Sequence, residues 1–286
     1  MKKIIAILSA VILITATFAG CSGSKEKSRI ATEINDTVLL LGYTEEAAPF
    51  IENVKDGAAE GFIPELWDKI FDSVKGDFKA YRFERVEKGY ELEKDGGFKG
   101  TDGKEYSASL LVGAVHKNDG TFNEDYSFTE PIITNRIIAV TKKDGGVASY
   151  SDFTGKKALT TTAEAKAAFE KHSRLYSACE SVGEAKNRDA AMLALDRGTA
   201  DVIITDEFTY MPLANKDNYT VLDGELDTIE YVIACAKYSG WKYSINEAIK
   251  ELLSADYGEG DELTPLVERH FGYNASSFEY ITEGDK

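Results

Sequence analysis

The sequence is poor in cysteine, histidine and basic residues, and each shortage argues against a class of function. Its three cysteines, Cys21, Cys179 and Cys235, form no disulfide framework, so we expect the last two to be buried free thiols. The three histidines are scattered without the spacing of metal ligands. Lysine and arginine number 33 against 49 acidic residues, and the formal net charge of −16 argues against nucleic acid as a partner.

After its N-terminal segment the sequence has no long apolar run. No stretch there reaches the roughly 18 residues that a membrane-spanning helix needs. Residues 1–20 differ, because a lysine pair precedes an apolar run at residues 4–17, as in a secretory signal. Residues 22–28 are small and polar, which is typical of a flexible tether. An uncleaved N-terminal membrane anchor is the alternative interpretation.

The chain does contain enough apolar material for sizeable cores, with 43% hydrophobic and 11% aromatic residues, and its length suits about two domains. Apolar runs typical of buried strands occur at residues 38–41, 109–115, 136–141, 200–206 and 231–236. Helices are expected from Pro64, near Thr161, over residues 189–196, from Ser244 and from Thr264. This alternation predicts an α/β fold with parallel or mixed sheets covered by helices.

Three side chains stand at or after the ends of expected strands: Tyr43, His116 and Asp206. In open α/β sheets, ligands bind at the carboxyl ends of strands. These residues are therefore candidates for binding before any family is named.

Several short motifs are informative through their order along the chain. They are Gly61-Phe62 with Glu65, residues 126–131 (YSFTEP), residues 151–157 (SDFTGKK), Ala194-Leu195 through Gly198, Ala200-Asp201-Val202, Thr205-Asp206-Glu207 and His270-Phe271-Gly272. Each motif is weak alone. Their co-linear order resembles the solute-binding receptors of bacterial amino-acid ATP-binding-cassette (ABC) transporters, the polar-amino-acid family of type II periplasmic binding proteins. The resemblance extends over about residues 38–273.

The N-terminal segment resembles the lipobox of bacterial lipoproteins. Phe18-Ala19-Gly20-Cys21 places small residues before a cysteine, with Phe18 where leucine is usual. This resemblance implies removal of residues 1–20, lipidation of Cys21 and an extracytoplasmic protein anchored to the cell membrane. Residues 21–36 would form the lipidated end and the flexible tether.

The family resemblance implies an α/β protein with the two-lobe type II periplasmic-binding-protein fold and two crossing hinge strands. Lobe 1 would comprise residues 37–133 and 232–286, and lobe 2 residues 134–231. A small solute would bind in the cleft between the lobes, and closure would be recognised by an ABC permease. The same resemblance implies a monomer that needs no cofactor and no metal and is not an enzyme.

The resemblance also assigns binding residues. In the family, an aromatic side chain of the first loop packs on the ligand, and Tyr43 and Phe50 match these positions. A core role is the alternative for Phe50. The acid after the second-lobe strand receives the ligand's ammonium group, and Asp206 matches it, with helix capping as the alternative. Glu207 beside it is expected to be solvated.

Two departures from the family pattern bear on the ligand. The arginine that grips the ligand's carboxylate in the family has no counterpart between residues 115 and 128. Its role could pass to His116, Lys117 or Thr134, although a lysine offers a point charge in place of the arginine fork. Threonines also stand at residues 160–162, where Gly-Thr or Gly-Ser is common.

The hydroxyls of Thr161 and Thr162, at a helix N-terminus, could still hold an anionic group. The ligand therefore need not be a standard α-amino acid. A modified amino acid, a small peptide, or an amine whose acid group lies elsewhere are all open.

The sequence thus predicts a lipid-anchored receptor that binds a small polar, amino-acid-like solute and delivers it to an ABC permease. One alternative is a surface sensor or interaction module whose cleft is vestigial. The other is a dehydratase-like enzyme on the same scaffold, with Glu130, Asp206 or Glu207 as general acid. No nucleophile motif or convincing acid–base pair supports the enzyme.

Overall fold

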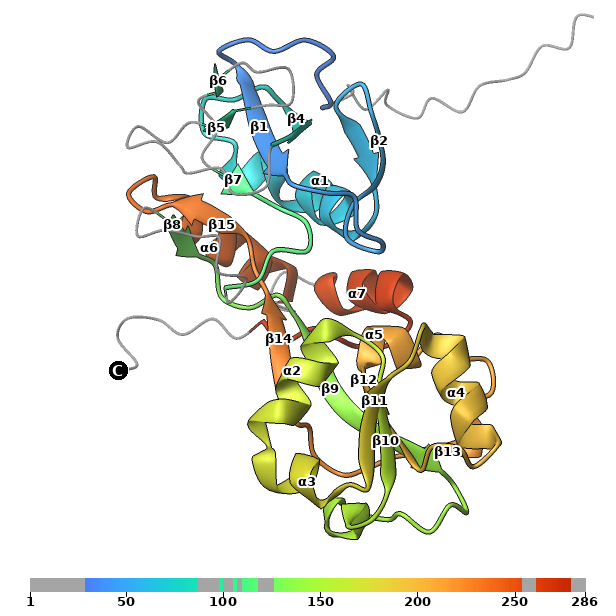
Figure 1. The fold of residues 1–286 in the computed structure, drawn as a ribbon. Coiled ribbons are helices and arrows are strands. Elements are labelled where there is room, and N and C mark those ends of the chain that lie inside the picture. The colour runs from blue at the N-terminus through green and yellow to red at the C-terminus, as the bar shows by residue number, and fades with distance from the viewer. Residues whose placement is uncertain are drawn as a thin grey trace, which may run out of the picture.

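The structure is a computed structural model, which describes residues 29–86, 98–99, 105–106, 110–117, 126–253 and 261–278. The predicted signal, Cys21 and residues 22–28 lie outside the described residues. Within these ranges the chain forms two sheets with helices packed on them, arranged as two lobes (Figure 1). None of the helices described is both long enough and apolar enough to span a membrane.

Among the described residues, the first sheet has five strands in the order β4-β1-β7-β15-β8. Their bounds are β1 Val38–Tyr43, β4 Ala80–Arg85, β7 Leu110–Leu111, β8 Tyr126–Phe128 and β15 Ala234–Ala236. β1 pairs in parallel with β4 and β7, whereas β15 pairs antiparallel with β7 and β8. Every residue of β1 is buried, as its continuous apolar run predicts for a strand covered on both faces.

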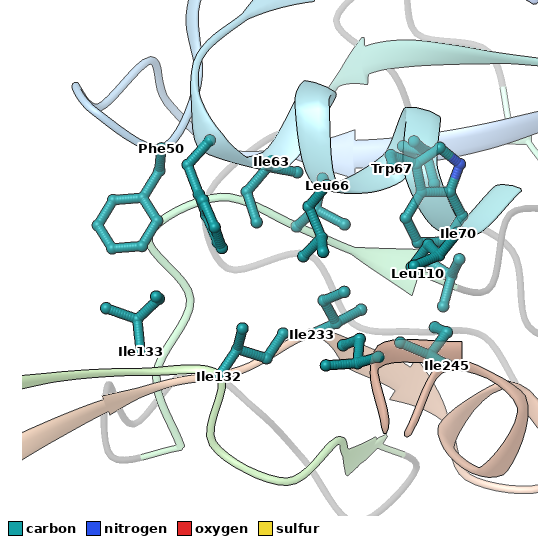
Figure 2. Close-up of a cluster of buried hydrophobic side chains, with 14 of the residues drawn as sticks. Phe50, Ile63, Leu66, Trp67, Ile70, Leu110, Ile132, Ile133, Ile233 and Ile245 are labelled. Carbon is teal, nitrogen blue, oxygen red and sulfur yellow. The ribbon is translucent and has the colours of Figure 1, made fainter. Parts of the chain in front are cut away.

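The helices of this first lobe are α1 Phe62–Val74, α6 Trp241–Leu253 and α7 Leu263–Phe271. Apolar residues at helical spacing bury one face of α1. Figure 2 shows Leu66, Trp67 and Ile70 of α1 beside Leu110 of β7 and Ile245 of α6, in the main hydrophobic core. Each fully buried side chain of this kind contributes about 1.5–3 kcal/mol.

Two helices begin earlier than the sequence predicts. α1 begins at Phe62, so Pro64 lies inside the first turn, where its missing N–H has no intrahelical partner to lose. α6 begins at Trp241, and Ser244 donates its backbone N–H to Gly240 from within the helix. The predicted cap at Ser244 is therefore wrong.

The second sheet has the strand order β11-β10-β12-β9-β13, and β14 also pairs with β9. The bounds are β9 Ile133–Lys142, β10 Lys157–Thr160, β11 Ser181–Glu184, β12 Val202–Asp206, β13 Tyr219–Val221 and β14 Asp227–Tyr231. Because β10 is parallel to β11 and β12, these strands end at one edge of the sheet. The second lobe also contains α2 Ala163–Lys171, α3 Ser173–Ala178, α4 Arg188–Asp196 and α5 Glu207–Tyr210.

Shorter elements lie outside the two sheets. They are the pairs β2 Glu52–Lys55 with β3 Ala58–Glu60 and β5 Phe98–Lys99 with β6 Glu105–Tyr106, and the 3₁₀ turns at Tyr150–Phe153 and Lys216–Asn218. The β2–β3 hairpin directly follows the loop that carries Phe50, so it helps to define the course of that loop.

The chain connects the lobes by crossing from β8 to β9 and returning from β14 to β15 (Figure 1). β9 and β14 pair antiparallel next to the crossings, with Ile133 opposite Tyr231. The side chains of Ile132, Ile133 and Ile233 belong to the first-lobe core (Figure 2). The exact residue limits of the two lobes stay a prediction.

Backbone hydrogen bonds hold both ends of the described chain. Ala31 donates its N–H to the carbonyl oxygen of Tyr81 (3.0 Å), and Tyr81 donates to that of Arg29 (2.9 Å). Residues 29–31 of the predicted flexible tether therefore pair with the edge of β4, and the limits of the tether stay a prediction. At the other end, Thr134 of β9 donates its N–H to Ala275 (2.9 Å) in the segment after α7.

Candidate functional site

A pocket of about 260 Å³ is lined by residues of both lobes. The first lobe contributes Ala47, Ala48, Phe50, Ala114 and His116, and the second contributes Asn135, Thr162, Glu164, Asp206, Phe208, Ile229 and Tyr231. We refer to this pocket as the aromatic pocket. Four of the predicted binding residues line it, namely Phe50, His116, Thr162 and Asp206.

The N-terminus of α1 positions Phe50. The backbone N–H of Phe62 donates to the carbonyl oxygen of Pro49 (2.8 Å), and that of Ile63 donates to Phe50 (3.0 Å). Gly61 makes this approach possible, because a Cβ at residue 61 would lie 2.7 Å from the Phe50 carbonyl oxygen and its φ is 113°. The Gly61-Phe62 motif thus acts by holding a pocket loop against a helix.

Phe50 combines the two roles that the sequence left open. It is 3% exposed and belongs to the first-lobe core, and it also lines the aromatic pocket. Its ring centroid lies 4.5 Å from that of Tyr231 and 6.0 Å from that of Phe208. Rings from both lobes therefore meet at one wall of the pocket.

Asp206 ends β12 and caps α5. It is 6% exposed, and its Oδ1 accepts hydrogen bonds from the backbone N–H of Thr209 (3.0 Å) and from Nδ2 of Asn135 (3.1 Å). Its Oδ2 accepts from the Thr209 hydroxyl (2.8 Å). The capping alternative is confirmed, and the same carboxylate lines the pocket. These donors are neutral, and among the described residues no lysine or arginine forms an ion pair with Asp206.

Asn135 was not predicted, although its side chain forms hydrogen bonds with two other residues that line the pocket. It is 3% exposed in β9, and its side-chain oxygen accepts from the backbone N–H of Phe208 (3.2 Å) while its nitrogen donates to Asp206. Burial raises the pKa of Tyr231 to about 12, and a side-chain hydrogen bond with Asn135 opposes that rise. The available signal was a lone amide just before the apolar run at residues 136–141.

Thr134, predicted as one possible substitute for the missing arginine, does not line the aromatic pocket. Its hydroxyl donates to that of Ser277 at 2.6 Å. Successive side chains of a strand point to opposite faces. In β9, Ile133, Asn135 and Ile137 are buried, whereas Thr134 and Arg136 are more exposed on the other side.

Tyr43, which the resemblance places against the ligand, lies elsewhere in the structure. It is the last residue of β1, is 5% exposed and belongs to the first-lobe hydrophobic core. It does not line the aromatic pocket. Burial, aided by Glu46, raises the pKa of its hydroxyl. A position at the end of a strand did not ensure exposure, because the core extends over that end.

The threonines at residues 161 and 162 serve the start of α2. Thr162 is the N-cap, and its hydroxyl accepts from the backbone N–H of Ala165 (3.1 Å), so the helix begins at the threonines, as predicted. Thr161 instead donates its hydroxyl to that of Thr205 (2.7 Å). Both line a second pocket, of about 280 Å³, that also includes Lys166.

Lys117 lines a third pocket, of about 420 Å³, which we call the lysine pocket. It comprises His116, Lys117, Ile137, Glu164, Ala167, Ala168, Lys171, Asp227, Thr228, Ile229 and Glu230. His116, Glu164 and Ile229 line both this pocket and the aromatic pocket, so the two adjoin.

Glu207 is not solvated, contrary to the prediction. It is 5% exposed, and Arg136 grips it in a two-pronged pair, with Nε 2.9 Å from Oε2 and Nη2 2.5 Å from Oε1. This pair raises the pKa of Arg136, against the effect of burial. Burial and the nearby Glu207 carboxylate raise the pKa of Tyr273, whose hydroxyl lies 3.4 Å from Oε2. The two adjacent acids thus differ in their partners. Glu207 is paired with Arg136, whereas Asp206 forms no ion pair with a lysine or arginine among the described residues.

The other candidate chemistry lies away from the aromatic pocket. Glu130 lies 4.0 Å from Lys242 and lines none of the three pockets. Cys179 and Cys235 are free thiols, as predicted, but Cys235 is buried whereas Cys179 is only half-buried. Burial raises the pKa of Cys235 to about 12. The described residues contain no group of three or more His, Cys, Asp or Glu side chains placed to hold a metal ion.

Comparison with solved structures finds this fold in proteins of ABC transporters. A polar amino acid ABC uptake transporter substrate binding protein from Streptococcus thermophilus matches with a TM-score of 0.62 and 19% identity, covering 84% of this chain and 88% of that chain. The L-cystine solute receptor of Neisseria gonorrhoeae, in its unliganded open conformation, matches at 0.60 and 17%, covering 85% and 96%. An ABC uptake transporter substrate binding protein from Streptococcus pneumoniae with bound histidine matches at 0.50 and 20%, covering 84% and 95%.

At the level of sequence, no protein-family model and no curated protein matches the chain. The likeness therefore lies in the arrangement of sheets, helices and crossings. It confirms the fold predicted from the order of short motifs. The chain has the two-lobe α/β fold of type II periplasmic binding proteins, which is the fold of amino-acid ABC transporter substrate-binding proteins.

Proposed function

We propose that the protein is an extracytoplasmic receptor that binds a small polar solute bearing an ammonium group in the aromatic pocket and delivers it to an ABC permease. The observation that carries this proposal is the Asp206 carboxylate, which is buried, lines a pocket shared by both lobes and is held by neutral donors. A carboxylate in such surroundings forms strong charge-assisted hydrogen bonds with an ammonium group. A ligand that touches both lobes also favours the conformation in which they lie together.

The structural neighbours support a small ligand that bears an ammonium group. The Streptococcus pneumoniae protein has histidine bound, and the Neisseria gonorrhoeae protein is an L-cystine receptor. Both of those ligands carry ammonium groups. The alternative of a vestigial cleft is less well supported, because Asp206, Asn135 and the aromatic rings form an ordered pocket.

A purified chain of residues 22–286 should rise in melting temperature with at least one solute from a panel of amino acids, amines and other small metabolites. A ligand that binds only the folded state stabilises it by about 2.7 kcal/mol at 100 times its Kd. Thermal unfolding with and without each solute checks this. If no solute of the panel raises the melting temperature, the result would contradict the receptor function and favour the sensor alternative.

We also propose that lipidated Cys21 attaches the protein to the membrane. Cys21→Ala should move the protein from the membrane fraction to the soluble fraction, because two acyl chains provide stable anchoring. Immunoblots of the two fractions measure this. Cys179→Ala, which alters a free thiol in the second lobe, is the matched control and should stay in the membrane fraction. Retention of the Cys21 variant would instead support an uncleaved N-terminal anchor.

A further inference from the structure

The charged groups that line the aromatic pocket are mainly of one sign. Among its described lining residues, Asp206 and Glu164 carry carboxylates, none is lysine or arginine, and only His116 can gain a positive charge. Glu164 is exposed where the aromatic and lysine pockets adjoin. The side-chain charges of the pocket are therefore negative on balance, although Thr162, the N-cap of α2, places the positive end of that helix at the same pocket.

The described lysines of the two pockets that share residues with the aromatic pocket already have acidic partners. In the second pocket, which shares Thr162, Lys166 Nζ lies 2.5 Å from Glu184 Oε1. Lys171 Nζ lies 2.5 Å from Asp227 Oδ2, and Lys117 Nζ lies 3.8 Å from Glu230 Oε2. Both lysines belong to the lysine pocket and neither lines the aromatic pocket. A carboxylate held close to Asp206 would therefore find no unpaired lysine beside it within the described part of the chain.

The rings of the pocket add attraction for a positive charge. Phe208 and Tyr231 lie nearly parallel, with centroids 5.8 Å apart, and Phe50 completes the wall. The faces of aromatic rings attract organic cations, and the attraction grows where water is excluded. The same faces offer nothing to a carboxylate.

These observations favour the ammonium group of an amino acid in the pocket and disfavour its carboxylate group. In an α-amino acid the ammonium and carboxylate groups are attached to the same carbon, so a site that holds one must accommodate the other nearby. Here the carboxylate would face Glu164 and Asp206, and like charges placed together reduce affinity.

Taking the proposed receptor function as given, we propose that the ligand is an organic amine without a carboxylate next to its ammonium group. Asp206 and the three rings hold the ammonium group. The rest of the molecule extends past His116 and Glu164 toward the lysine pocket, which presents charges of both signs.

Calorimetric titration of residues 22–286 with amino acids and their decarboxylated amines tests this directly. The pairs are histidine and histamine, lysine and cadaverine, tyrosine and tyramine, and arginine and agmatine. At about pH 8, where imidazole is neutral, at least one amine should bind about tenfold more tightly than its parent amino acid. An amino acid that binds more tightly than its amine overturns the proposal.

The outcomes distinguish this inference from the receptor function. If none of the eight compounds binds while a solute of the thermal panel that is not such an amine does, the inference alone fails. If nothing binds in either experiment, the receptor function fails with it.

A variant provides an independent measurement of the repulsion. Glu164→Gln should reduce the preference for amine over parent amino acid by about threefold, because one of the two acids near the carboxylate becomes neutral. Glu180→Gln is the matched control, since Glu180 is an exposed acid of the second lobe that lies 3.9 Å from Lys157 and lines none of the three pockets. Equal preferences in both variants overturn the role of Glu164.

Discussion

Asparagine in place of Asp206 should weaken the binding of an ammonium-bearing ligand by about 100-fold, because the change removes the charged partner of a buried ion pair. The protein should remain folded. Asparagine caps helices as well as aspartate does, and it retains an oxygen for Thr209 and Asn135. Calorimetric titration gives the Kd, and thermal unfolding shows whether stability is unchanged.

Two control variants make this result specific. Asp152 is another carboxylate of the second lobe that accepts backbone hydrogen bonds, from Ala148 (3.0 Å) and Ser149 (2.9 Å), but lines none of the three pockets, so Asp152→Asn should leave the Kd unchanged. Glu207→Gln weakens the pair with Arg136 and should lower the free energy of unfolding by about 1–3 kcal/mol with little effect on the Kd. Equal losses of affinity for the Asp206 and Glu207 variants would remove Asp206 from its assigned role.

Phe208→Ala should both weaken ligand binding about tenfold and lower the free energy of unfolding by about 2–3 kcal/mol. The Phe208 ring, carried by α5 of the second lobe, lies 4.8 Å from that of Phe271 and packs on the first-lobe core, so it joins the lobes. It also lines the aromatic pocket. Urea unfolding and calorimetric titration measure the two effects separately.

Phe78→Ala is the matched control for that prediction. Phe78 is a half-buried ring of the first lobe, stacked on Trp241 with centroids 6.2 Å apart, and it lines none of the three pockets. Its removal should reduce stability but leave the Kd unchanged. If the Phe78 and Phe208 variants bind ligand equally well, the ring of Phe208 does not contribute to the site.

The candidate site shows how much of its geometry local sequence patterns can predict. Asp206 was predicted because a strand followed by an acid is visible within a few residues of sequence. Asn135 was missed, whereas its neighbour Thr134 was named as one possible substitute for the missing arginine. The face that a strand residue occupies depends on pairing with distant strands, and a shift of one residue reverses it. Here β9 pairs with β12 and β14, which lie far along the chain.

The pair of acids at residues 206 and 207 illustrates the same limit. The local sequence does not show which of the two carboxylates has neutral donors and which is bound to arginine. The difference arises because Arg136 and Asn135 lie on opposite sides of β9. Arg136 contacts Glu207, and Asn135 contacts Asp206.

The sequence by itself determined the alternation of strands and helices, the excess of acid and the order of motifs, because periodicity, composition and short motifs are local properties of a chain. The family that its motifs resemble also implied the two-lobe fold and the position of Phe50, and the sequence indicated His116, Thr162 and Asp206. Only the tertiary structure decided that Tyr43 belongs to the core, that Phe208 and Tyr231 join Phe50, and that Asp206 has no cation among the described residues. These outcomes depend on contacts between segments far apart in the chain, which local patterns do not specify.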